Sequence, residues 1–122
     1  MEEQQQKLTS EELSNFSGTE NYYKLTLNPL VRFTDGCQYV AEKGKAFWLM
    51  DIIASYNTKT FIVKYPFQVW KLKVNDNEGL ITMQEDSDKP FIVKQKIPYT
   101  DFPLSEITFY CIDGVCLLTS EY

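Results

Sequence analysis

The sequence contains no histidine, and this limits the chemistry that its other polar side chains can perform. Without imidazole the chain has no usual proton shuttle at neutral pH, which excludes Ser-His-Asp and Cys-His catalysis and histidine metal sites. A serine nucleophile would need a lysine base, and no S-x-x-K arrangement occurs. The five glycines form neither G-x-x-x-x-G-K-[ST] nor G-x-G-x-x-G. We therefore predict no catalytic residue and no cofactor.

Carboxylates are the remaining candidates for acid–base or metal chemistry. Asp51 interrupts an apolar stretch, where desolvation would raise its pKa, but no second carboxylate lies one helical turn away. Glu85, Asp86 and Asp88 offer oxygen ligands in a short segment, yet the turn glycine and closing glutamate of a calcium loop are missing. We interpret Asp51 as a surface or lysine-paired residue and the acidic segment as a solvated turn, and we predict no metal site.

The three cysteines, Cys37, Cys111 and Cys116, form no CxxC pair and no zinc spacing. An odd number of cysteines favours buried free thiols in a reducing compartment. The first seven residues lack the basic and apolar regions of a secretion signal. We therefore expect a cytoplasmic protein with no contact to membranes.

Lysines and aromatic residues are the candidates for binding. Lysines on outward faces of predicted strands, beside tyrosines, are typical of sheets that hold single-stranded RNA, although solvated strand lysines also keep sheet edges from aggregating. Two Trp, eight Tyr and eight Phe exceed what the core needs, so we expect some of them to form a contact patch. The predicted partner-binding residues are Tyr22, Tyr23, Trp48, Tyr65, Tyr99, Lys71, Lys73, Lys94 and Lys96.

Hydrophobic periodicity predicts the elements that position these residues. Residues 1–8 are read as a mobile tail, and Thr9 with Glu12 forms a capping box that opens a short helix. One long helix is expected from Gly36 to Tyr56, with Phe47 in its core-facing stripe. A strand is expected within residues 30–33, and from Phe61 onward the apolar period changes to two.

The strand signals then follow one another closely. Residues 67–74, 80–84 and 91–97 predict a meander, with Trp70 and Leu72 facing the long helix. Asp113-Gly114 predicts a two-residue hairpin turn of type I′, which would place Cys111 opposite Cys116. The expected fold is α+β: an antiparallel sheet of about five strands with one long helix packed on one face and a short N-terminal helix.

Length and charge limit the function classes. A chain of 122 residues with 43% hydrophobic residues accommodates one domain, expected over residues 9–122. The net charge is −5, but five of the acidic residues and one of the basic ones lie in residues 1–20, so the body is nearly neutral. That argues against a general basic field for nucleic acid and against mimicry of DNA by the whole surface.

Several segments resemble a family of small uncharacterised proteins found largely on phages, plasmids and other mobile elements. The resemblance is carried by residues 16–24, 34–43, 46–55, 67–72 and 97–104, by Asp113-Gly114-Val115 and by Ser120-Glu121-Tyr122. It implies a domain of unknown function and supplies no catalytic residues. In size, charge and lack of catalytic motifs the chain is also similar to anti-CRISPR proteins that block RNA-guided nucleases.

Three functional hypotheses follow. The first is a non-enzymatic inhibitor that binds a host defence effector protein, with or without its guide RNA, and has no small-molecule substrate. The second is an accessory nucleic-acid-binding module for plasmid or phage maintenance that uses the lysines. The third is an enzyme built around Asp51, Asp101 and tyrosines. The oligomeric state is left open.

Overall fold

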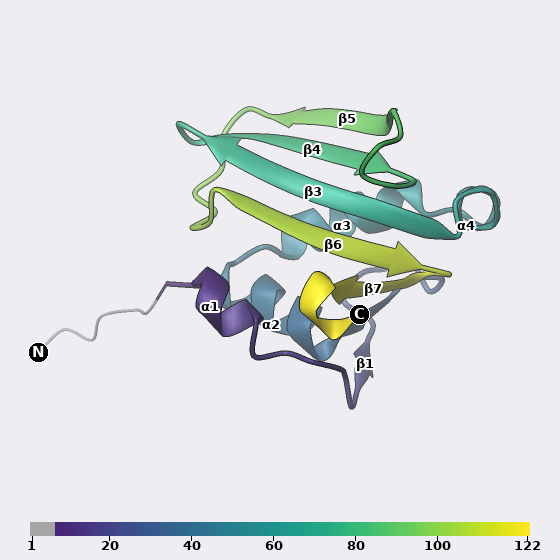
Figure 1. The fold of residues 1–122 in the computed structure, drawn as a ribbon, viewed down its shortest axis with the longest axis horizontal. Helices are drawn as coiled ribbons and strands as arrows, with labels where there is room; N and C mark the ends of the chain where they lie inside the picture. The colour runs from purple at the N-terminus through teal and green to yellow at the C-terminus, as the bar shows by residue number, and fades with distance from the viewer. Residues whose placement is uncertain (1–6) are drawn as a thin grey trace, which may run out of the picture.

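The computed structural model describes residues 7–122 and shows a twisted sheet with helices behind it (Figure 1). The helical elements are α1 (Ser10–Leu13), α2 (Asp35–Lys43), α3 (Phe47–Tyr56), α4 (Lys59–Lys64) and the 3₁₀ turn η1 (Thr119–Glu121). The strands are β1 (Tyr22–Tyr23), β2 (Arg32–Thr34), β3 (Phe67–Asn75), β4 (Glu78–Gln84), β5 (Phe91–Ile97), β6 (Glu106–Ile112) and β7 (Val115–Leu118).

Most of the tail expected over residues 1–8 lies outside the described residues. Of its two described members, Leu8 is buried in the hydrophobic core. The capping box at Thr9 and Glu12 is confirmed, and α1 ends one turn later at Leu13. In the described part of the chain no helix is long and apolar enough to cross a membrane.

The sheet has seven strands in the order β1-β2-β7-β6-β3-β4-β5. All neighbours pair antiparallel except β2 and β7, which are parallel. The α+β class and the β3-β4-β5 meander are confirmed, while the expected number of strands was too low. The strand expected within residues 30–33 is β2, shifted to Arg32–Thr34. The strand that was not expected is β1, whose two residues are too few to show a period of two.

The expected helix from Gly36 to Tyr56 is wrong, because the chain forms two helices there. The break is a Schellman motif: the Ala46 N–H donates to the Ala41 carbonyl at 2.9 Å, and Lys45 has a φ of 52°. Glycine usually occupies that left-handed position. Here Gly44 precedes it and a lysine fills it, so the usual signal for a helix end is displaced by one residue.

The helix break also corrects the predicted core. α3 restarts the helical phase, so Leu49, Met50 and Ile53 are fully buried while Phe47 remains 43% exposed. The placement of Trp70 and Leu72 beneath the helices is confirmed, since both are buried and Tyr56 of α3 packs on Trp70 at 5.7 Å between ring centroids.

Residues 59–64 form a helix, although the sequence predicts an extended segment from Phe61. Thr58 caps α4 by accepting the Phe61 N–H at 3.2 Å. Next to it lies a buried amide network in which Trp70 Nε1 donates to Gln68 Oε1 at 2.6 Å and Gln68 Nε2 donates to Asn57 Oδ1 at 2.7 Å. This network connects the end of α3 to β3.

The Asp113-Gly114 hairpin is confirmed as predicted. Both residues have positive φ, 50° and 86°, as a type I′ turn requires. Cys111 and Cys116 lie directly opposite each other, and all three cysteines are buried free thiols. Burial raises the pKa of the thiols of Cys37 and Cys116, which makes them poor nucleophiles.

The buried carboxylate of Glu121 connects the end of the sheet to the start of α2. It accepts hydrogen bonds from the Thr34 hydroxyl at 2.6 Å, the Gly36 N–H at 3.1 Å and the Leu118 N–H at 2.9 Å. A carboxylate at this position caps the N-terminus of a helix and interacts favourably with its dipole.

The corrected core predicts the effect of two substitutions in α3. Ile53→Ala should lower the free energy of unfolding by about 2–5 kcal/mol, because it leaves a cavity at a fully buried site. Phe47→Ala should lower it by about 1 kcal/mol, since much of this ring is in solvent. Urea unfolding measures both. A larger loss for Phe47→Ala would contradict the helix break.

Gly36 should not tolerate a side chain. A Cβ at this position would lie 2.6 Å from Glu121 Oε1 and from Leu118 Cδ1, so Gly36→Ala should cost about 1–3 kcal/mol although alanine favours helices. The control is Gly18→Ala, because a Cβ there meets nothing within 4 Å. Equal melting temperatures for the two variants would contradict the Glu121 contact.

Candidate binding face

One face of the sheet packs on the core, and we call the opposite face the open face. In β6, for example, Ile107, Phe109 and Cys111 are buried, while the alternate residues Thr108 and Tyr110 are partly exposed. The same alternation in β3 buries Trp70 and Leu72 and turns Lys71 and Lys73 outward. In Figure 1, α2 and α3 lie behind the sheet, and the 3₁₀ turn η1 is drawn in front of β7.

The four predicted lysines of the strands are brought together on the open face. Strand register aligns Lys71 with Thr82 and then Lys94, and aligns Lys73 with Leu80 and then Lys96. We call these four residues the lysine array. Lysines of the same strand lie about 7 Å apart and those of β3 and β5 about 10 Å apart, from standard strand spacings.

Carboxylates surround the array at the ends of the strands. Glu106 lies opposite Lys73 in the register and 3.8 Å from the Lys71 ammonium. Asp76 and Glu78 lie at the β3–β4 turn, where they line a hollow that also includes Lys73 and Lys96. The row of paired residues that contains Lys94 and Lys71 ends instead at Thr108 of β6. Asp76 and Glu78 therefore lie next to Lys73 and Lys96, whereas the carboxylates of Glu106 and Asp86 lie near Lys71.

An aromatic cluster occupies the same face beside the array. Phe67, Tyr110 and Tyr122 contact one another with ring centroids 5.2, 5.7 and 5.2 Å apart. At the sheet edge the Lys94 ammonium lies 5.7 Å from the ring centroid of Phe91, which is exposed. Lys71 and Lys94 therefore each have aromatic side chains close by.

The β4–β5 turn folds over the open face and forms a hollow of about 480 Å³ next to Lys71. Gln84 holds the turn, since its Nε2 donates to the Lys89 carbonyl at 2.7 Å. The hollow is lined by Phe67, Val69, Lys71, Asp86, Ser87, Thr108, Tyr110 and Thr119.

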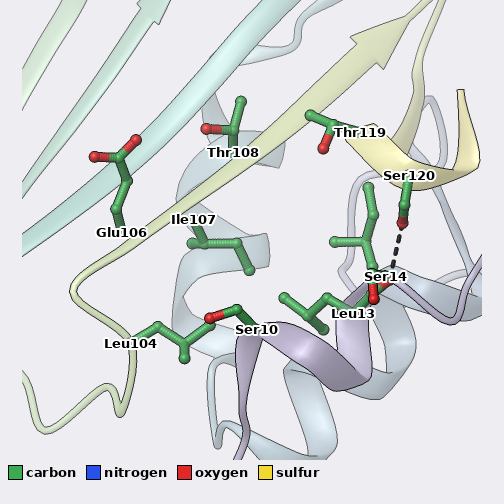
Figure 2. A pocket seen from close by; sticks show the side chains of 10 residues that line it. Ser10, Leu13, Ser14, Leu104, Glu106, Ile107, Thr108, Thr119 and Ser120 are labelled. Carbon is green, nitrogen blue, oxygen red and sulfur yellow. Dashed lines mark hydrogen bonds between the residues drawn. The ribbon is translucent and has the colours of Figure 1, made fainter.

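A cleft of about 310 Å³ adjoins this hollow, and the two share Thr108 and Thr119. It lies between α1 and the part of β6 beyond the end of β7 (Figure 2). Leucine and isoleucine side chains form its apolar lining. Its polar lining is Glu106 and the hydroxyl-bearing Ser10, Ser14, Thr108, Thr119 and Ser120. The Ser120 hydroxyl donates to the Leu13 carbonyl at 2.9 Å and so ties α1 to η1.

The five predicted aromatic contacts are not gathered into a patch. Tyr22 and Tyr23 form β1, at the opposite edge of the sheet from β5. Trp48 lies in α3 and Tyr65 just after α4, where both are half-buried, and Tyr99 is 70% exposed in the loop after β5. The predicted lysines and the predicted aromatic residues therefore do not form one surface.

The aromatic cluster was missed by the sequence analysis. The alternation that turns Lys71 and Lys73 outward also turns Phe67 outward, and the same rule applied to β6 turns Tyr110 outward. These two residues could have been found from the period of two. Tyr122 could not, because it follows η1 and no strand pattern includes it.

The carboxylates considered for chemistry do not converge. Asp51, Glu85, Asp86, Asp88 and Asp101 are all exposed, and within residues 7–122 no group of His, Cys, Asp and Glu side chains is arranged to hold a metal ion.

Two carboxylates with shifted pKa values act in structural contacts. The pKa of Asp35 is lowered chiefly by the Glu20 N–H, and Asp35 in turn accepts the Tyr23 hydroxyl at 2.9 Å and raises the pKa of that tyrosine. Glu12 of α1 accepts hydrogen bonds from Lys43 and Tyr39. These contacts lower the pKa of Glu12 from 4.5 to about 2, with Lys43 the largest cause.

Comparison with known proteins defines the family but no activity. Residues 7–122 match the model of a family of unknown function, DUF6876, so the chain belongs to that family. No curated protein and no solved structure matches the chain.

The Glu12 contacts predict how stability depends on pH. Because the pKa of Glu12 is about 2 in the folded protein and near 4.5 in the unfolded chain, the contact stabilises fully above pH 4.5 and is lost as the pH falls towards 2. The destabilisation of Glu12→Gln relative to the unaltered protein should therefore shrink over that range in urea unfolding. Glu11→Gln is the control, since Glu11 is an exposed neighbour. A difference independent of pH would contradict the Lys43 contact.

Proposed function

We propose that the protein is a non-enzymatic binding protein that acts by stoichiometric occupation of a partner, with the open face as its contact surface. The observation that carries this proposal is the position of the lysine array and the aromatic cluster together on the sheet face opposite α2 and α3. A basic patch on a protein of net charge −5 favours an anionic partner surface, and exposed aromatic side chains are typical of interface centres.

The partner that we propose is an RNA-guided effector nuclease, alone or as its guide-RNA complex, so that the protein would act as an anti-CRISPR inhibitor. Two considerations support it: the resemblance to proteins of mobile elements, and the lysine array, which suits a partner that carries phosphates. A cytoplasmic location fits this role, and the three free cysteines are consistent with a reducing compartment.

The lysine array also supports a second candidate, an accessory nucleic-acid-binding module for plasmid or phage maintenance. Such a module would bind bare nucleic acid with an affinity that falls steeply with salt. Only an inhibitor would in addition bind the effector and lower its cleavage of target DNA.

Titration against purified RNA-guided nucleases tests the proposal. Cleavage of target DNA should fall in proportion to added protein and reach its minimum near one protein per effector. Lys71→Glu with Lys94→Glu should abolish this inhibition, because the two substitutions reverse the charge of two members of the lysine array. The matched control is Lys24→Glu with Lys59→Glu, which makes the same change of charge at exposed positions after β1 and in α4.

The possible results separate the hypotheses. Complete inhibition by far less than one protein per effector would indicate that the protein is an enzyme. Tight binding to bare nucleic acid with no effect on any nuclease would favour the maintenance module. Absence of a complex with every effector tested would refute the anti-defence proposal, and equal loss of inhibition in the control variant would refute the assignment of the open face.

A further inference from the structure

We propose that the open face binds single-stranded RNA, whose backbone crosses the strands over Lys94 and Lys71 and continues past Thr108 and Thr119 into the cleft beside α1. This inference rests on the proposed use of the open face as the contact surface and adds the chemistry and the path of the ligand.

The path of the backbone follows from the distribution of charge. Lys94, Thr82, Lys71 and Thr108 form one continuous level across β5, β4, β3 and β6. Glu106 occupies the next level, and Asp76 and Glu78 close the strand ends beyond it. A phosphate chain that ran along the strands past Lys73 would meet Glu106 and then Asp76 and Glu78. One that crosses the strands meets Lys94 and Lys71 before it reaches the carboxylates of Asp86, at the hollow, and Glu106, at the cleft.

Bases would stack on the aromatic surface beside this path. The cluster of Phe67, Tyr110 and Tyr122 borders the hollow next to Lys71, and Phe91 lies beside Lys94. A single strand can turn its bases onto such rings, whereas a duplex keeps its bases paired and stacked within the helix. The combination of lysines and rings therefore favours a single strand.

The hydroxyl-lined cleft favours RNA over DNA. Thr108 and Thr119 line both the hollow and the cleft, so a strand that leaves the lysine level reaches these two hydroxyls first (Figure 2). Ser10 and Ser14 lie further along, on α1. Serine and threonine hydroxyls can donate to or accept from a ribose 2′-hydroxyl, the group that distinguishes RNA from DNA.

Fluorescence anisotropy with a short labelled single-stranded RNA of mixed sequence tests the proposal. Because the path passes two lysines, affinity should fall roughly sevenfold between about 50 and 200 mM salt, from a slope of about −0.7 per contact. Lys71→Gln with Lys94→Gln should weaken binding at low salt and remove most of that fall. Lys24→Gln with Lys59→Gln, at exposed positions elsewhere, should leave both unchanged.

Two further variants test the proposed contacts of the protein with the bases and with the ribose. Tyr110→Leu, which keeps an apolar side chain but removes the ring, should weaken binding roughly fivefold or more. Thr108→Val with Thr119→Val should reduce the preference for RNA over DNA of the same sequence while the lysine-dependent salt effect remains. Melting temperatures confirm that each variant is folded.

The outcomes distinguish this inference from the proposed function. No binding of the RNA at low salt, binding insensitive to the Lys71 and Lys94 variant, or a preference for duplex would overturn the inference. Equal affinity for DNA would overturn the choice of RNA. If the protein binds an effector that carries no guide RNA one to one but does not bind the RNA, the proposed function stands and the RNA contact is refuted. If RNA binds as described but no effector is inhibited, the inference stands and the anti-CRISPR role is refuted.

Discussion

The hydrogen-bonded pairing of β3 with β4 and β6 is the constraint on which the rest of the structure depends. It places Trp70 opposite Met83 and Phe109, all on the buried face, and Lys71 opposite Thr82 and Thr108 on the other. A slip of one residue would turn the lysines towards the core and the tryptophan into solvent. Core packing and surface charge are thus consequences of the same register.

The helix layer explains why one face of the sheet stays open. The amide network from Asn57 to Gln68 and Trp70 connects the α3–α4 junction to the buried face, and Glu121 connects η1 and β7 to the start of α2. These contacts hold α2 and α3 on a single side of the sheet. The open face then gathers four of the lysines of a protein with net charge −5, with carboxylates beside them at the strand ends and in the β4–β5 turn.

The candidate site was predictable in part. The lysines follow from a period of two within β3 and β5, because alternation is a local property of a strand. Their alignment into one array depends on β4, which separates the two strands and places both pairs at matching levels. The aromatic cluster combines β3, β6 and the residue after η1. No local pattern relates such distant positions, and the predicted aromatic patch was consequently assembled from residues that the fold separates.

The tetrapeptide Phe-Ile-Val-Lys shows where the sequence alone was sufficient and where it was not. At residues 61–64 it lies in α4 and at 91–94 it begins β5. The sequence by itself determined the α+β class, the capping box, the type I′ hairpin and the outward lysines, because each depends on the preferences of neighbouring residues. The tertiary structure decided the state of the tetrapeptide. Its first copy follows the Thr58 cap and packs on Tyr56 and Tyr65, whereas its second copy pairs with β4. A short apolar run has similar propensity for both states, so its long-range partners select between them.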